Sequence, residues 1–106
     1  MRSMTEELID AIRIDFHIHS RYSYDSLMKV EKIIQVAKNR GLNGLAIVDH
    51  NTIRGGLEGI KVNKQEDFIV ICGAEIATDK GEIVGLFLTE EIKSRHALEV
   101  IDEIKS

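Results

Sequence analysis

The stretch IRIDFHIHS (residues 12–20) decides how this chain is expected to fold. Apolar and polar residues alternate through residues 12–18, which predicts a β-strand whose alternate side chains point to opposite faces. Asp15, His17 and His19 then share one face, and two imidazoles project side by side from the end of the strand. This arrangement suits two ligands of one metal ion, with Asp15 orienting one of the rings. A half-exposed strand with a polar outer face explains the same pattern equally well.

The rest of the chain alternates between strand-like and helix-like periodicity. The predicted strands are residues 12–18, 44–48, 68–76 and 82–88, and the predicted helices are residues 3–11, 28–41, 55–64 and 94–106. The segments GLAIV (44–48) and FIVICGAEI (68–76) are continuous apolar runs, which are typical of strands buried on both faces. The tetrapeptide TDKG (78–81) predicts a tight turn into the last strand. This order of elements predicts an α/β fold.

Two of the predicted helices have a clear apolar face. In the helix over residues 28–41, the residues expected to face the core are Val30, Ile33, Ile34 and Ala37, and Gly41 is expected to end the helix. In the helix over residues 94–106, Ser94 is expected to be the N-cap. The residues of that helix expected to be buried are Ala97, Ile101 and Ile104.

The composition is that of one small globular domain. The chain has 106 residues, of which 43% are hydrophobic and 30% are charged, and this length allows one modest core. The formal net charge of −4 argues against long nucleic acid or a membrane surface as a partner. No apolar run approaches the ~20 residues of a membrane span, and the N-terminus lacks the apolar region of a signal peptide. Cys72 is the one cysteine, so no internal disulfide forms, and a cytoplasmic location is expected.

Side chains that can bind metal follow three of the predicted strands. GLAIV runs directly into Asp49 and His50, FIVICGA runs into Glu75, and Asp25 lies in the loop after the first strand. Sites in α/β folds form at the carboxyl ends of the strands, so these groups are expected to converge with the two histidines of the first strand. Glu75 has apolar neighbours, and a buried carboxylate needs a partner such as a metal ion; an exposed strand position is the alternative. Asp49 is expected either to cap the turn in DHNT or to support a ligand without touching the metal.

Four motifs, in order and with natural spacing, resemble the N-terminal half of the PHP (polymerase and histidinol phosphatase) superfamily. The motifs are DFHIHS, YSYDS, AIVDHNT and GAEI. The resemblance implies a metal-dependent phosphoesterase on a distorted (β/α)7 TIM-like barrel, with zinc, manganese or iron ions at the carboxyl ends of the strands. His17 and His19 would then bind one ion, and Glu75 would bridge that ion to a second. Asp25 and His50 would hold a third ion.

The chain departs from the family pattern after these motifs. The later His-Pro and Asp-x-His motifs of the family are absent, because the chain has no proline and His96 is its only remaining histidine. His96 itself is expected to be exposed on the last helix. Residues 1–106 are therefore expected to form one partial PHP domain that stops before the later metal ligands. The expected function is hydrolysis of a phosphate mono- or diester by a metal-activated water, weak or absent in this chain alone; the alternative is a non-catalytic remnant that binds metal or serves structure or interaction.

Two loop arginines are candidates for contact with substrate phosphate. Arg21 lies in SRYSYDS and Arg54 lies in NTIRGG, although solvated loop charge explains each of them singly. A small phosphorylated substrate is expected, and mixed histidine and carboxylate ligands favour zinc, manganese or iron over calcium. A four-stranded half-barrel would leave an open sheet edge, so a homodimer or larger homo-oligomer is also expected.

Overall fold

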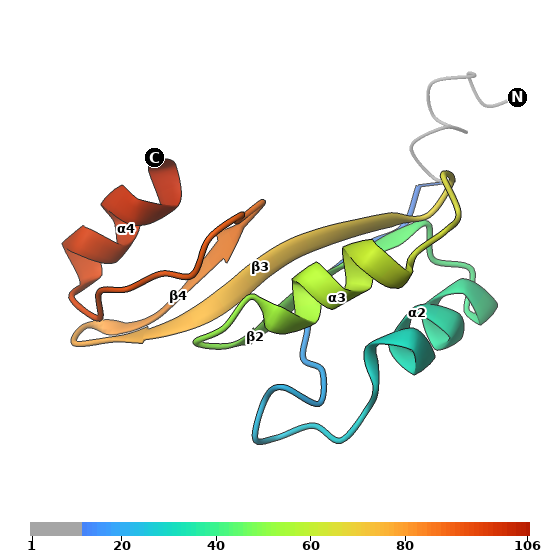
Figure 1. Cartoon of the computed structure of the whole chain (residues 1–106), viewed down its shortest axis with the longest axis horizontal. Coiled ribbons are helices and arrows are strands. Elements are labelled where there is room, and N and C mark those ends of the chain that lie inside the picture. The colour runs from blue at the N-terminus through green and yellow to red at the C-terminus, as the bar shows by residue number, and fades with distance from the viewer. Residues whose placement is uncertain (1–11) are drawn as a thin grey trace, which may run out of the picture.

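Strands and helices alternate along the chain, with one hairpin near its end (Figure 1). The computed structural model describes residues 12–106, and the helix predicted over residues 3–11 lies outside them. The strands are β1 (Ile14–Ile18), β2 (Gly44–His50), β3 (Ile69–Thr78) and β4 (Gly81–Leu86), and the helices are α2 (Val30–Asn39), α3 (Arg54–Val62) and α4 (Ala97–Lys105). Within residues 12–106, no helix is both long enough and apolar enough to cross a membrane.

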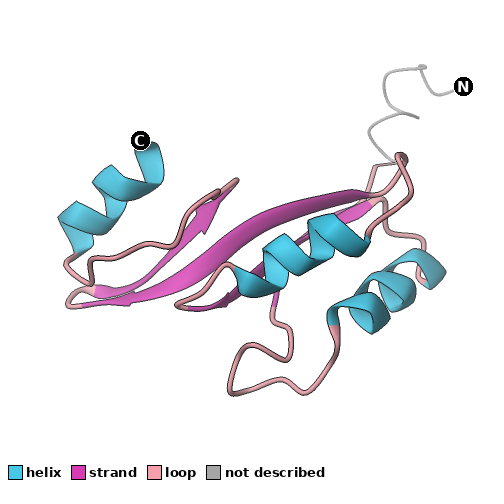
Figure 2. Ribbon diagram, viewed as in Figure 1, coloured by secondary structure: helices cyan, strands magenta, loops and turns pink. Residues whose placement is uncertain are grey.

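The four strands form one sheet in the order β1-β2-β3-β4. β1, β2 and β3 run parallel, because α2 and α3 each return the chain to the start of the next strand. β4 runs antiparallel to β3, and their hairpin closes where Thr78 pairs with Gly81, at the turn predicted for TDKG. Figure 2 shows β3 as a long curved strand with α2 and α3 on one side of the sheet.

β2 forms the centre of the core and is buried on both faces, as its apolar run predicts. Residues 45–48 have no exposed surface. Leu45 and Ile47 pack against α2, whose buried residues are the four predicted ones: Val30, Ile33, Ile34 and Ala37. On the opposite face, Ala46 and Val48 form a smaller cluster with residues of β3 and β4. The position of the end of β2 is therefore well determined by packing.

Helix α3 meets the sheet through glycines, which have low intrinsic helix propensity. Gly55 lies beside the side chains of Asp49 and Ser20, and a methyl group added at Gly56 would lie 2.6 Å from the Cys72 sulfur. No side chain longer than a hydrogen atom fits at these positions. The helix thus lies close against β2 and β3, and its start is held near the end of β2.

The predicted boundaries and burial of the last helix are wrong in two respects. Helix α4 has His96 at its N-cap position, and the Ser94 hydroxyl donates to Glu99 instead of capping the helix. Val100 is the buried residue of α4, whereas Ile101 is 37% exposed. Val100 belongs to the buried cluster that includes Ile76 and Leu88, and Ile104 packs against this cluster, whereas Ile101 does not belong to it.

The sheet face away from the helices is partly open. Ile69, in the segment predicted to be buried on both faces, is 48% exposed, because no described element covers that end of β3. Phe16 of β1 is also 50% exposed. β1 is also an edge strand, and its outer edge has no partner among the described strands.

Candidate metal centre

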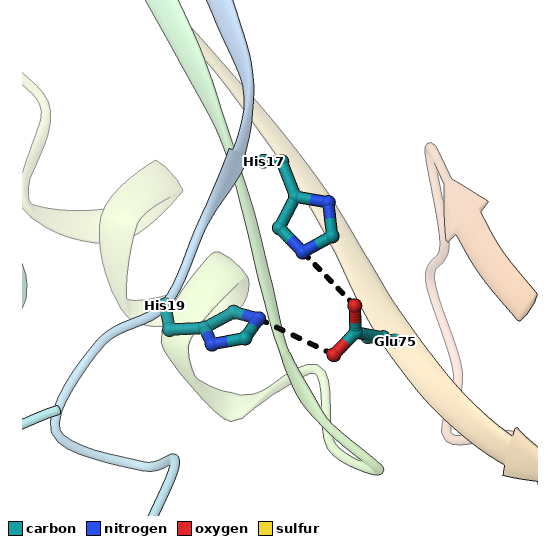
Figure 3. Close-up of side chains that lie close together, drawn as sticks. All are labelled: His17, His19 and Glu75. Carbon is teal, nitrogen blue, oxygen red and sulfur yellow. Dashed lines mark ion pairs between the residues drawn. The ribbon is translucent and has the colours of Figure 1, made fainter. Parts of the chain in front are cut away.

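Three imidazoles converge on one buried carboxylate at the carboxyl ends of the parallel strands. His17 Nε2 lies 3.0 Å from Glu75 Oε1, and His19 Nε2 lies 3.5 Å from Glu75 Oε2 (Figure 3). His50 Nδ1 lies 3.1 Å from the same Oε2 atom. The ladder between β2 and β3 pairs His50 directly with Glu75, and β1 delivers the other two histidines from the far side of β2. The structure thus brings together four residues that are up to 58 positions apart in the chain.

Asp25 joins this cluster from the loop after β1. Its carboxylate lies 3.1 Å from His19 Nδ1 and 3.0 Å from His50 Nε2. The hydrogen bond with His50, and after it the one with His19, holds the pKa of the Asp25 carboxyl below its usual range. Asp25 therefore presents an ionised carboxylate at neutral pH. Asp25, His19, Glu75 and His50 form a closed ring in which each imidazole lies between two carboxylates.

A β-bulge explains how His17 reaches this cluster. Asp15 pairs with Leu45 and Ile18 pairs with Ile47, so two residues of β1 lie opposite one residue of β2. Leu45 and Ile47 face α2, which places Asp15 on the α2 side of the sheet, away from the imidazoles. The strict alternation predicted for residues 12–18 is therefore wrong.

The bulge also gives Asp15 a different contact from the predicted one. Its Oδ1 accepts the backbone N–H of His17 at 3.0 Å. Among the hydrogen bonds of residues 12–106, Asp15 makes none to an imidazole ring. Asp15 therefore stabilises the backbone of the bulge, and its contact with His17 is to the backbone N–H and not to the imidazole ring.

Asp49 is fully buried and anchors the loop that carries Asp25. Its carboxylate accepts hydrogen bonds from the backbone N–H and the hydroxyl of Ser20, and from the hydroxyl of Ser23 at 2.7 Å. The Ser23 hydroxyl in turn accepts the backbone N–H of His50 at 2.9 Å. Asp49 thus touches no imidazole ring among the described contacts, but it ties the loop after β1 to the end of β2.

Two residues at the cluster were missed by the sequence analysis. Glu82 of β4 has a carboxylate oxygen within reach of His50 and Glu75, so these three side chains can share an ion. Hydrogen bonding to Glu75, together with the charge of Glu75, raises the pKa of Glu82. Tyr24 stacks on the His50 ring at a centroid distance of 4.6 Å. The hairpin register was a usable signal for Glu82, since it lies opposite Ala77 on the same face as Glu75.

The two candidate arginines, Arg21 and Arg54, both contact the ring of Tyr22. The guanidinium carbons of Arg21 and Arg54 lie 5.1 Å and 4.9 Å from the centroid of the Tyr22 ring. Arg21 also pairs with Glu58 at 3.1 Å, whereas Arg54 takes part in no ion pair within residues 12–106. The fourth histidine, His96, has a side chain that is 74% exposed, as predicted.

The donor set fits a divalent cation. A neutral imidazole has one N–H and one nitrogen lone pair, yet both nitrogens of His19 and of His50 face carboxylate oxygens. In the neutral form of each ring, one lone pair would point at a negative oxygen, and a cation between them would remove this repulsion. His19 Nε2 is buried without a hydrogen-bond partner, which is the state expected of an unused ligand atom.

The donor atoms also form three overlapping groups, each spanning at most 4.8 Å. The groups are His17–His19–Glu75, His19–Asp25–His50 and His50–Glu75–Glu82. Imidazole and carboxylate donors of this kind can hold a metal ion. Within residues 12–106, Glu75 pairs with imidazoles and with no lysine or arginine, so the negative charge of the cluster has no other permanent counter-charge.

Fold and site together define an α/β protein with a metal-type donor cluster at the carboxyl ends of its strands. The PHP domain model matches residues 15–103, which is most of the chain. The chain therefore belongs to the PHP domain family.

A relative of known sequence and two solved structures are similar to this chain over part of their length. The protein MJ1587 of Methanocaldococcus jannaschii is 43% identical over 105 residues, which cover 89% of this chain and 61% of MJ1587. The chain thus spans about three fifths of that relative.

A two-domain crystal structure from Bacteroides vulgatus, named for a predicted PHP-like metal-dependent phosphoesterase, matches with a TM-score of 0.76 at 21% identity, over 89% of this chain and 32% of that chain. A crystal structure from Bifidobacterium adolescentis, provisionally named a metal-dependent phosphoesterase, matches with a TM-score of 0.59 at 29% identity, over 72% of this chain and 27% of that chain. The first match confirms the predicted fold: the curled sheet is a half-barrel that corresponds to a portion of a PHP-like barrel.

Proposed function

We propose that this chain supplies the metal centre of a metal-dependent phosphoesterase, which hydrolyses a phosphate mono- or diester. The observation that carries the proposal is the ring of Asp25, His19, Glu75 and His50, in which both nitrogens of each imidazole face carboxylates. A zinc, manganese or iron ion bound there supplies water activation and neutralises charge on the phosphate. Membership of the PHP domain family supports metal-dependent hydrolysis.

The positions of the donors indicate what each contributes. Glu75 is buried in β3 and touches three imidazoles, so it is the donor that neighbouring ions can share. His17 is half exposed and stands at the solvent side of the cluster, whereas His19 and His50 are mostly buried. Glu75 with the two buried histidines therefore sets the geometry, and His17 lies where a substrate can approach.

We propose a small phosphorylated compound as the substrate. The loop after β1 and the first residue of α3, which both follow strand ends that carry metal donors, bring Arg21 and Arg54 together on Tyr22. Arg54 is the stronger candidate for phosphate contact, since Glu58 already neutralises Arg21. The net charge of −4 supports a small substrate over a long polyanion.

Metal content and hydrolysis test the proposal together. After loading with Mn²⁺ or Zn²⁺ and dialysis, the chain is expected to retain fewer than three ions, because its three donor groups share His19, His50 and Glu75. Glu75→Gln is expected to lose most of the bound metal, since it removes a charge from two groups at once. Glu90→Gln, in an exposed loop position after β4, is the matched control and should retain as much metal as the wild type.

Hydrolysis of p-nitrophenyl phosphate and of its bis ester then separates the two functions considered. Metal-dependent turnover that His17→Ala abolishes supports the phosphoesterase, and we expect such turnover to be weak in the isolated chain. Metal binding without any turnover supports the alternative, a non-catalytic metal-binding or interaction module. A wild-type chain that retains no ion refutes the metal centre itself.

A further inference from the structure

Asn51 has an uncommon backbone conformation directly after His50. Its φ angle is +58°, in the left-handed region that residues other than glycine enter rarely and asparagine enters more often than most. A left-handed residue turns the main chain away from the strand direction, and here the chain leaves β2 for the start of α3. Pairing between β2 and β3 would be expected to stop at this point.

Two hydrogen bonds of Asn51 nevertheless extend the β2–β3 ladder. The backbone N–H of Asn51 donates to the carbonyl oxygen of Glu75 at 2.9 Å. The backbone N–H of Ala77 donates to the side-chain oxygen Oδ1 of Asn51, also at 2.9 Å. In a regular parallel ladder the Ala77 N–H would donate to the backbone carbonyl of Asn51. The side chain therefore replaces the bond that the left-handed turn removes.

We propose that Asn51 is a positioning residue for the metal centre, which holds Glu75 in register with His50. The two bonds lie on the side of β3 that faces β2, one at the carbonyl oxygen of Glu75 itself and one two residues later at Ala77, so they continue the pairing of β3 with β2 directly after Glu75. β4 pairs with the other side of β3, so loss of the Asn51 side chain leaves β3 in the sheet. What changes is the alignment of Glu75 Oε2 with His50 Nδ1, now 3.1 Å apart. The inference rests on the proposed function, because it concerns the same centre.

Asn43 offers a matched control at the opposite end of the sheet. Its Oδ1 accepts the backbone N–H of Arg13 at 2.9 Å, so it makes the same kind of bond between two neighbouring segments. No candidate metal donor adjoins it in the chain. Glycine at either position removes the same side chain and adds the same backbone freedom to the unfolded chain, and glycine also accepts the left-handed conformation of position 51.

Calorimetric titration with Mn²⁺ of the wild type, Asn51→Gly, Asn43→Gly and Asn51→Asp tests the proposal. Asn51→Gly is expected to bind Mn²⁺ about tenfold or more weakly, as is typical when a residue that orients a ligand is lost. Asn43→Gly is expected to bind within about twofold of the wild type, since its bond lies far along the sheet. Asn51→Asp keeps an acceptor oxygen and tolerates the turn, so it is expected to bind at least as tightly as the wild type.

Thermal unfolding of the metal-free proteins separates positioning from general stability. The two glycine variants are expected to lose similar amounts of thermal stability while differing in Mn²⁺ affinity. Equal Mn²⁺ affinities in the two glycine variants would overturn the inference. A tenfold loss of Mn²⁺ affinity in Asn51→Asp would also overturn it. If Asn51→Gly does not fold, the Mn²⁺ affinity of Asn51→Asp decides the question. A wild-type protein that binds no Mn²⁺ overturns the proposed function along with the inference, so the wild-type titration distinguishes the two failures.

Discussion

Replacement of Asp49 by asparagine tests how strongly one buried carboxylate holds the loop that carries Asp25. The two carboxylate oxygens of Asp49 accept three hydrogen bonds, two from Ser20 and one from Ser23. Asparagine keeps one acceptor oxygen and places an NH₂ group where the second oxygen accepted the Ser20 hydroxyl. At least one buried donor therefore loses its partner, and the others lose a charged one.

The expected loss of stability follows from these three bonds. Hydrogen bonds to a charged group contribute about 1.5–3 kcal/mol each, and neutral ones about 0.5–1.5 kcal/mol. Asp49→Asn loses one bond and weakens two, while the lower cost of burying an amide offsets part of the loss. We expect the free energy of unfolding to fall by about 2–4 kcal/mol, which lowers Tm by roughly 10–20 °C in a domain of this size.

Urea unfolding followed by far-UV circular dichroism measures this loss. Asp79→Asn is the matched control, because Asp79 is exposed and accepts one backbone N–H, from Ala97 at 2.9 Å, which asparagine can also accept. The control is expected to lose less than about 1 kcal/mol. If Asp49→Asn lost no more than the control, the view that this carboxylate organises the loop would be refuted.

Four further outcomes are expected. Gly55→Ala should unfold at a markedly lower urea concentration, by about 1–3 kcal/mol, since its methyl group would overlap the Asp49 carboxylate; native-like stability would contradict the close packing of α3. The N–H groups of residues 93–94 hold the pKa of the Glu103 carboxyl below its usual range, so its contribution to stability is present at neutral pH and is lost as the pH falls through the lowered value. Acid titrations of the wild type and Glu103→Gln should therefore differ least at low pH. Glu82→Gln should reduce the number of Mn²⁺ ions retained after dialysis, and an unchanged count would remove Glu82 from the centre. Light scattering should show a homodimer or larger species, because the outer edge of β1 is open; a monomer at high concentration would contradict this.

Much of the candidate centre was predictable because it depends on local patterns. Apolar runs identify β2 and β3, and the residues that follow or end these runs, His50 and Glu75, must lie at the same edge of a parallel sheet. The HxH pair of β1 is found in the same way, and the resemblance to the PHP family agrees with all of these positions. Periodicity also identified the core face of α2 correctly.

Other parts of the centre depend on how strands pair, which the order of residues does not specify directly. Asp15 was placed with the imidazoles because strict alternation was assumed, and a single bulge moves it to the other face. Glu82 was missed because its proximity to Glu75 depends on the register of the hairpin, which the sequence indicates only indirectly, through the predicted turn at TDKG. The role of Asn51 depends on one left-handed residue at the end of a ladder.

The sequence by itself determined which elements form and which side chains stand at their carboxyl ends, because side-chain direction within a strand or helix repeats with a fixed period. Only the tertiary structure decided which of those side chains touch. Strand register, the bulge in β1 and the anchoring of the loop by Asp49 each result from contacts between segments far apart in the chain. A shift of one residue in the pairing of two strands turns each side chain of one strand to the opposite face, so the final geometry of the centre is a property of the packed sheet.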